Sequence, residues 1–355
     1  MAGTTTDEES RLRRGPSHVE DPTIEQLADE AARTDDVAVR RTLFGWRELI
    51  STLIPLVLIA IAARNVDWEE ALRALGRSQA YYVALALAVY YATFPLRSWR
   101  WSVLLRTSGV RVFWNDLLRI LFLGWFVNCI VPAKLGDLYR SFLVKQRFGV
   151  SLSRTVGVVV AERLLDLLVV FVLLIVGGYV AFGRTFLPDL RVVYLTGAGL
   201  LVAIVVALVA VYWVAPRIAR FFPREVRRIG RLFREGVLHS FRALPVAGPL
   251  TVIIWSCEAL RLFFVLTALG LDLPLSGVVF VAVATSLLTT VPLTPAGFGF
   301  VEIAMVYVLT EGFGLAQSDA IAVAVVDRAV SVLSLIVVGA IVYVRTPHEE
   351  RVGRR

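Results

Sequence analysis

The sequence predicts an all-α polytopic membrane protein, with about six full transmembrane helices and two broken, re-entrant helical pairs arranged as an inverted repeat. Three observations predict this class. Hydrophobic residues make up 57% of the chain and the mean hydropathy is +0.71, more than a soluble domain with a wet surface carries. Eight or more apolar segments meet or approach the length of about 20 residues that a helix needs to cross a bilayer. Proline and glycine interrupt the chain at two corresponding places.

The first 48 residues differ in composition from the rest of the chain. They hold 11 acidic and 7 basic side chains and few aromatic ones, a balance that is typical of a disordered polar arm. The first apolar segment begins only after this arm, so we expect no secretory signal peptide. We therefore predict a cytoplasmic arm at 1–48, a transmembrane domain at 49–345 and a basic cytoplasmic tail at 346–355.

The first half of the transmembrane domain contains six segments in succession. The first is short and carries Pro55, the third ends at Pro132, and the fourth is amphipathic rather than apolar throughout. The others are apolar along most of their length. In order, the segments are 49–63, 81–105, 117–131, 133–148, 155–182 and 192–215.

A basic linker at 216–245 separates the two halves of the domain. Its arginines recur every three or four residues with apolar side chains among them, which is the pattern of an interfacial amphipathic helix. An ordinary solvated cytoplasmic loop is the alternative interpretation. The second half then contains a Pro/Gly break at 292–299 and apolar segments at 250–269, 277–291, 300–309 and 321–344.

The distribution of arginine predicts the orientation of the chain. The arm, the linker and the tail are rich in arginine, as are the regions 97–111 and 134–154. Between Arg261 and Arg328 there is no lysine or arginine at all. Because cytoplasmic loops carry the excess of basic residues, we predict a multi-pass protein of the plasma membrane with both termini in the cytoplasm.

The two halves resemble each other as an internal duplication, with copies at 81–182 and 246–345. The predicted orientation gives their leading helices opposite directions, so the copies are inverted. Inverted repeats with helices broken at matching positions characterise alternating-access transporters, whose site lies near the breaks. A duplication kept for architecture alone is the alternative. The matching landmarks are Arg100 with Arg261, 132–136 with 295–299, and Glu162-Arg163 with Asp327-Arg328.

Charged side chains inside the apolar segments are the main candidates for substrate binding. A charge at a helix centre costs about 2.5–3.5 kcal/mol on insertion scales, so such groups face the bundle interior and find partners. Arginine binds two phosphate oxygens at once, and helix ends at the breaks favour anions, so an anionic headgroup is the expected ligand. Salt bridges that only hold the bundle together are the alternative. The candidates are Arg100, Gly136, Asp137, Arg140, Glu162, Arg163, Asp166, Glu258, Arg261, Gly299, Glu302, Asp327 and Arg328.

Four short motifs carry a family resemblance: RSWRW at 97–101, PAKLGDLYR at 132–140, ERLLD at 162–166 and PAGFGFVE at 295–302. Together they resemble the lysylphosphatidylglycerol synthase transmembrane-region family, the flippase-like membrane half of bacterial phosphatidylglycerol aminoacyltransferases. The resemblance covers about residues 49–345 and implies movement of a phospholipid, or of another lipid with an anionic or modified headgroup, between leaflets. The sequence shows no acyltransferase domain after the last span, so we expect no aminoacylation of lipid.

The predicted function is that of a lipid translocator of the flippase or scramblase type, with a phospholipid or a polyprenyl-phosphate-linked lipid as its partner. Nothing resembles a nucleotide phosphate loop, and no soluble basic domain is present to bind nucleic acid. The three histidines, His18, His239 and His348, lie outside the apolar segments, so we expect no metal site, no cofactor and no enzyme activity. The alternatives are an accessory protein that works with enzymes of lipid-linked glycan or cell-envelope synthesis, and an intramembrane lipid-modifying enzyme that acts through carboxylates.

Overall fold

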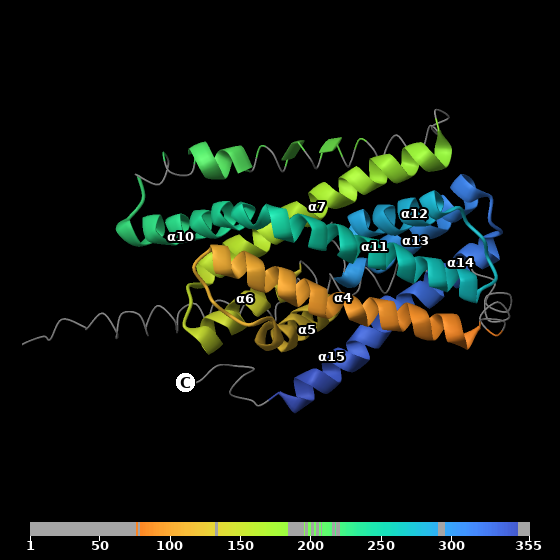
Figure 1. Ribbon diagram of the computed structural model, residues 1–355, viewed down its shortest axis with the longest axis horizontal. Coiled ribbons are helices and arrows are strands. Elements are labelled where there is room, and N and C mark those ends of the chain that lie inside the picture. The colour runs from red at the N-terminus through yellow and green to blue at the C-terminus, as the bar shows by residue number, and fades with distance from the viewer. Residues whose placement is uncertain are drawn as a thin grey trace, which may run out of the picture. The chain divides into compact units, whose positions relative to one another are not determined.

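The computed structural model describes residues 79–131, 134–183, 221–289 and 295–346, together with Gly76 and scattered positions between 195 and 217. These residues form helices and no strands, which confirms the all-α class (Figure 1). The arm, the first predicted span at 49–63 and the tail after residue 346 lie outside the described residues. The α-helices are α4 (Ala80–Thr107), α5 (Trp114–Ile130), α6 (Leu135–Phe148), α7 (Leu152–Phe182), α10 (Arg224–Ser240), α11 (Leu244–Ala268), α12 (Leu275–Thr289), α13 (Phe300–Tyr307), α14 (Gln317–Arg328) and α15 (Ser334–Arg345). The short helical elements are η1 (Ala210–Val214), η2 (Phe241–Ala243), η3 (Pro295–Gly297), η4 (Val308–Gly312) and η5 (Ala329–Leu333).

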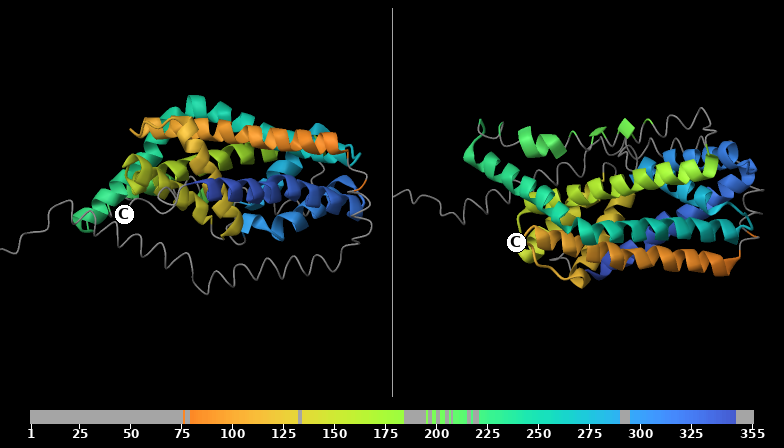
Figure 2. Two further views of the ribbon diagram at one scale, coloured as in Figure 1. Left: turned by 90° about the horizontal axis from the view of Figure 1, so that it is seen from below. Right: turned by 45° about the horizontal axis from the view of Figure 1, so that its top comes forward.

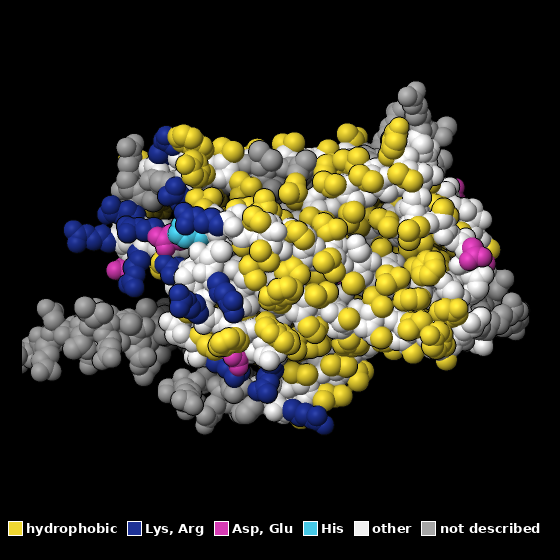
Figure 3. All heavy atoms as spheres, viewed as in Figure 1, with side chains coloured by type: hydrophobic (Ala, Val, Ile, Leu, Met, Phe, Trp, Pro, Cys, Tyr) yellow, Lys and Arg dark blue, Asp and Glu magenta, His cyan; other side chains and the backbone are white. Residues whose placement is uncertain are grey.

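Three helical stretches of the described chain are long and apolar enough to cross a membrane: Leu152–Phe182, Arg224–Ala268 and Gln317–Arg345. The second joins α10, η2 and α11, and the third joins α14, η5 and α15. The 28 residues of α4 reach about 42 Å at 1.5 Å per residue, which also exceeds the hydrocarbon core of about 30 Å. Figure 3 shows hydrophobic side chains over the middle of the visible face and basic side chains gathered at its left end.

The two leading helices, α4 and α11, lie side by side in both views of Figure 2. At one end, the backbone N–H of Gln79 donates a hydrogen bond of 2.8 Å to the carbonyl oxygen of Ala268. Farther along, Arg97 of α4 forms an ion pair with Glu258 of α11 at 2.7 Å. The start of α4 therefore meets the end of α11, which is an antiparallel arrangement.

Both leading helices end in the same backbone motif. Gly109 follows α4 and Gly270 follows α11, with φ of 84° and 71°. In each case the residue after the glycine donates its N–H to a carbonyl five residues earlier, at 2.9 Å and 3.0 Å. This is the Schellman arrangement, and glycine takes its left-handed φ without the penalty that a Cβ atom brings.

Two helical pairs are interrupted, one at a first break (131–134) and one at a second break (290–299). The first break separates α5 from α6, and the second separates α12 from α13; residues 132–133 and 290–294 lie outside the described chain. With 17 and 15 residues, α5 and α12 reach only about 25 and 22 Å, less than the core of about 30 Å. Within the described chain, Lys134 and Ala296 are the only residues other than glycine with positive φ, and each lies in one break. In Figure 1 the α5–α6 pair lies nearer the left end and the α12–α13 pair nearer the right.

Most of the predicted basic linker is the helix α10, which continues through η2 into α11. Its first residues are exposed, while its second half packs against α7. The approach is close because both helices place a glycine at the contact: a Cβ on Gly236 would overlap the carbonyl oxygen of Arg154, and one on Gly157 would overlap that of Phe233. Of the two interpretations of the linker, the structure shows the helix.

The last predicted span, 321–344, is not one regular α-helix. A single π-helical turn, η5, separates α14 from α15 directly after Arg328. Such turns are rare and occur often at functional sites. Here the turn lies beside the leading helix α4, and the hydroxyl of Tyr90 in that helix donates a hydrogen bond of 2.7 Å to the carbonyl of Ser331.

Candidate functional site

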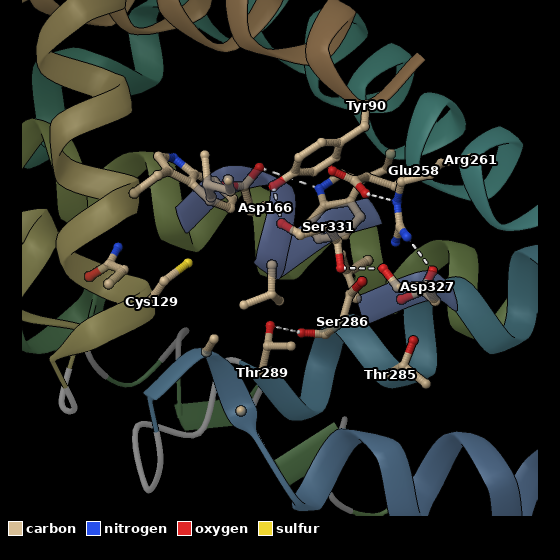
Figure 4. Close-up of a pocket in the computed structure, with 18 of the residues that line it drawn as sticks. Tyr90, Cys129, Asp166, Glu258, Arg261, Thr285, Ser286, Thr289, Asp327 and Ser331 are labelled. Atoms are coloured by element: carbon tan, nitrogen blue, oxygen red, sulfur yellow. Dashed lines mark hydrogen bonds and ion pairs between the residues drawn. The ribbon is translucent and has the colours of Figure 1, made fainter. Parts of the chain in front are cut away.

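A cavity of about 180 Å³ lies inside the helical bundle. Lys134 of the first break and Ala296 of the second break both line it. The close-up in Figure 4 shows Glu258, Arg261 and Asp327 grouped at one side of the same space. The rest of the lining comes from α4, α5, α7, α11, α12, α14, the η5 turn and α15. The cavity therefore lies where the two interrupted helices meet, and both halves of the chain build it.

The leading helices and α14 contribute a first ion-paired cluster to the cavity. Arg97 binds one carboxylate oxygen of Glu258 at 2.7 Å, and Arg261 binds the other at 3.0 Å. Arg261 also forms an ion pair with Asp327. All four side chains are buried, so this cluster offers no carboxylate that lacks a basic partner.

A second cluster begins on Arg100, which is fully buried beside the cavity lining. Its guanidinium donates to both carboxylate oxygens of Asp166 at 2.5 and 3.1 Å and to Glu162 at 2.8 Å. The other carboxylate oxygen of Glu162 accepts a bond of 2.9 Å from Arg140. The side-chain oxygen of Thr251 completes the set at 2.8 Å from Arg100. These bonds join α4, α6, α7 and α11 behind the cavity wall.

Two further ion pairs connect the interrupted helices to the helices that follow them. Arg163 of α7 makes two bonds of 2.8 Å to the carboxylate of Asp137 in α6, and Arg140 and Asp166 link this pair to the second cluster. Arg328 of α14 lies 2.9 Å from Glu302 of α13. Each pair joins residues that are 26 positions apart, and both arginines line the cavity. Both arginines thus line the cavity, and a carboxylate holds each guanidinium group in place.

Tryptophan rings cover part of the cavity wall. The guanidinium of Arg97 lies 4.8 Å from the ring centre of Trp125 and 6.0 Å from that of Trp255. Arg163 lies 6.0 Å from the ring of Trp125. At these distances an arginine gains a cation–π attraction. The wall therefore combines charged groups with apolar surface, which suits a ligand that has both a charged and an apolar part.

The structure brings most of the sequence-predicted candidates together around the cavity. Some of them line the cavity, and the others lie behind its lining. Five candidates lie behind the cavity lining and hold its charged groups in place: Arg100, Asp137, Arg140, Glu162 and Glu302. Six candidates line the cavity itself: Arg163, Asp166, Glu258, Arg261, Asp327 and Arg328.

The two candidate glycines have backbone roles. Gly136 packs against α5 so closely that a Cβ atom would overlap the carbonyl oxygen of Gly124. Gly299 has a φ of 85° and immediately precedes α13. Its N–H donates a hydrogen bond of 2.6 Å to Glu302, which closes the start of that helix. Both glycines therefore shape the breaks rather than line the cavity.

Several lining residues were not among the candidates. Arg97 lies one helical turn before Arg100. The repeat alignment, which pairs Arg100 with Arg261 at an offset of 161 residues, also pairs Arg97 with Glu258. This alignment could therefore have identified Arg97 as a candidate. Lys134 lies between the proline and the glycine of the motif at 132–140, where its residue type was visible but its surroundings were not. Nothing in the sequence marked Trp125 and Trp255, because tryptophan is enriched at membrane–water interfaces and needs no binding site to explain it.

The part of the chain that the structure describes holds no group of three or more His, Cys, Asp or Glu side chains arranged to bind a metal ion. The carboxylates near the cavity have arginine partners instead, as in the pairs of Glu258 with Arg97 and of Asp166 with Arg100. The charged groups of this lining are therefore held in guanidinium–carboxylate ion pairs.

Comparison with known proteins places the chain in a family. The family model described as lysylphosphatidylglycerol synthase TM region matches residues 48–339 of the chain. A UPF0104 membrane protein of Methanocaldococcus jannaschii is 32% identical over 219 residues, which cover 61% of this chain and 93% of that protein. A UPF0104 membrane protein of Methanothermobacter thermautotrophicus is 26% identical over 329 residues, which cover 82% and 94%. A protein named glycosyltransferase AglD from Haloferax volcanii is 28% identical over 319 residues, which cover 78% of this chain but only 51% of that protein.

Proposed function

The chain belongs to the lysylphosphatidylglycerol synthase TM region family of membrane proteins, and we propose that it moves a lipid with an anionic headgroup between the leaflets of the plasma membrane. The charged cavity at the two breaks carries this proposal. Three carboxylates line it, Asp166, Glu258 and Asp327, against five basic side chains, Arg97, Lys134, Arg163, Arg261 and Arg328.

Charged groups and interrupted helices are both costly inside a bilayer. Ionisable side chains there mark the pathways of substrates and ions, and non-helical backbone is tolerated where it is buried in protein or lines a cavity. The cavity of about 180 Å³ has room for a phosphate with a small substituent rather than for a whole lipid. A lipid would therefore place its headgroup in the cavity and keep its acyl chains among the apolar surfaces outside.

An inverted repeat would provide the motion that translocation needs. The leading helices are antiparallel, and the pair of Arg163 with Asp137 has the same spacing as that of Arg328 with Glu302. Likewise, Arg100 and Asp166 are 66 residues apart, as are Arg261 and Asp327. In alternating access, one such repeat rocks against the other around a fixed site. The basic end in Figure 3 would face the cytoplasm.

Translocation can be measured directly with the purified full chain. Proteoliposomes of phosphatidylcholine would carry a trace of fluorescent phosphatidylglycerol, and dithionite would quench the outer leaflet. We expect the wild type to bring inner-leaflet lipid to the quencher, and Arg163→Ala and Arg328→Ala to slow this by about tenfold or more, since a hydrogen bond to a charged group contributes about 1.5–3 kcal/mol. Arg154→Ala is the matched control, because Arg154 also lies on α7 but forms its ion pair with Glu235, away from the cavity.

The outcomes separate the function classes. Equal rates for the wild type and for empty vesicles, with phosphatidylglycerol and then with a polyprenyl phosphate, would contradict translocation. A change in the mass of the recovered lipid would indicate an enzyme instead. Loss of transport in Arg154→Ala as well as in Arg163→Ala would show general damage to α7 rather than a role of the cavity.

A second candidate function is that of an accessory protein in the synthesis of lipid-linked glycans. The similarity to the protein named glycosyltransferase AglD favours it, since that similarity extends over 319 residues. The chain spans about half of that relative, so the similarity concerns a part of it. Such a protein would bind a lipid-linked intermediate in the same cavity and would move no lipid in pure vesicles.

A further inference from the structure

The ion pairs around the cavity divide into three closed groups, and each group is electrically neutral. Arg97 and Arg261 are matched by Glu258 and Asp327. A second group balances its arginines and carboxylates in the same way: Arg100, Arg140 and Arg163 with Asp137, Glu162 and Asp166. The third group is the pair of Arg328 with Glu302.

Lys134 is the one basic side chain of the cavity lining for which no ion pair is formed within the described chain. It belongs to none of the three groups, so it leaves the site with one formal positive charge in excess. Because the groups cancel internally, this charge decides which net ligand charge the cavity favours.

The backbone conformation of Lys134 indicates that this residue does more than connect α5 to α6. Its φ of 53° is left-handed, a conformation that costs a residue with a Cβ about 1 kcal/mol and that glycine would adopt without this cost. In the alignment of 132–136 with 295–299, Lys134 corresponds to Gly297, which also has a left-handed φ, of 74°, but has no charged side chain. The two breaks therefore resemble each other in backbone shape but differ in charge, and the excess charge belongs to the first break alone.

We propose that Lys134 determines the charge selectivity of this site, and that the site takes a headgroup with one net negative charge, such as a phosphodiester. This rests on the proposed function in so far as the ligand is a lipid headgroup. A zwitterionic headgroup would leave the lysine unneutralised. A phosphomonoester with a second negative charge would find no second excess cation and would gain nothing over the monoanion.

Binding can be tested apart from transport. The purified full chain in a neutral detergent would be titrated with short-chain phosphatidylglycerol, phosphatidylethanolamine and phosphatidic acid, with tryptophan fluorescence as the readout because Trp125 and Trp255 line the cavity. We expect phosphatidylglycerol to bind about tenfold or more tightly than phosphatidylethanolamine, as one charge-assisted bond provides. Phosphatidic acid should bind no more tightly than phosphatidylglycerol.

Variants at Lys134 then test the residue itself. Lys134→Gln should weaken the binding of phosphatidylglycerol about tenfold or more. The affinity of this variant for phosphatidylethanolamine should stay the same, and that unchanged affinity would also show that the cavity has folded. Lys134→Arg should keep the preference. Lys145→Gln is the matched control: it removes the same charge at the only other lysine of the chain, which does not line the cavity.

Four results would overturn the proposal: equal wild-type affinities for the first two lipids, tighter binding of phosphatidic acid, a preference that survives in Lys134→Gln, or an equal loss for both lipids in that variant. Transport in vesicles separates this proposal from the proposed function. Selective binding without transport would support the assignment of Lys134 and refute translocation. Transport without selective binding would support translocation and refute the assignment of Lys134.

Discussion

Replacing Arg140 by alanine removes a fully buried guanidinium from the centre of the second ion-paired cluster. Arg140 lies on α6, and its guanidinium binds Glu162 of α7 at 2.9 Å. It also lies 3.4 Å from Asp137 and 4.8 Å from the ring centre of Trp101 on α4. The variant therefore removes contacts from three helices at once.

The size of the effect follows from what remains after the change. Removing one partner of a buried ion pair costs about 3–5 kcal/mol, because an uncompensated charge stays buried. In the variant, Glu162 still has Arg100 as an ion-pair partner at 2.8 Å. This remaining partner moves the expected loss of stability toward the lower end of that range. The lost packing and the lost cation–π contact with Trp101 add to it. We therefore expect the free energy of unfolding to fall by about 3–5 kcal/mol.

Arg147→Ala on the same helix is the control. Its ion pair with Asp116 spans 3.5 Å, and the two side chains are 36% and 42% exposed, so its removal should cost about 0–1 kcal/mol. Equilibrium unfolding of both variants in mixed micelles, followed by circular dichroism, would give the two losses side by side. Equal losses, or a loss below about 1 kcal/mol for Arg140→Ala, would refute the view that this cluster holds the cavity wall together.

Two helix contacts that depend on glycine can be tested by the same measurement. Gly136→Ala should lower the free energy of unfolding by about 1–3 kcal/mol, because the added Cβ would overlap the carbonyl oxygen of Gly124 and push α6 from α5. Gly236→Ala should cost a similar amount, since its Cβ would overlap the carbonyl oxygen of Arg154 and separate α10 from α7. Gly230→Ala, in the exposed part of α10 with no atom within 4 Å of the added Cβ, should instead stabilise the protein by up to about 1 kcal/mol. A loss in Gly230→Ala as large as in Gly236→Ala would mean that helix contacts are not the cause.

Local patterns in the sequence were sufficient for much of the fold. The predicted segment 155–182 lies within α7 (Leu152–Phe182), and 81–105 lies within α4 (Ala80–Thr107). Apolar runs predict helices well in a membrane protein, because the bilayer leaves the backbone few other ways to satisfy its hydrogen bonds. The π-helical turn η5 escaped prediction, since nothing in the residues Ala329–Leu333 departs from an ordinary apolar helix.

The sequence predicted which residue types form the candidate site, but not which of them line the cavity and which lie behind it. Sequence placed Arg100 and Arg163 in one set of candidates, and the structure puts Arg163 on the cavity and Arg100 behind it. Rotation of a helix by one or two residues decides between these positions. Such a rotation depends on neighbours that are far away in the chain.

The sequence by itself determined the class of this protein, the positions of its breaks and the kinds of charged residue near them. Apolar runs, proline, glycine and arginine each affect the backbone or the charge at their own position in the chain, so these properties can be read without knowledge of the packing. Only the tertiary structure decided which charges neutralise each other. Arg97 meets Glu258 across 161 positions and Arg100 meets Glu162 across 62, and such distant pairs form only when the helices pack. For the same reason, nothing in the sequence distinguished Lys134, whose charge matters because every other basic group of the cavity lining has a carboxylate beside it in the described chain.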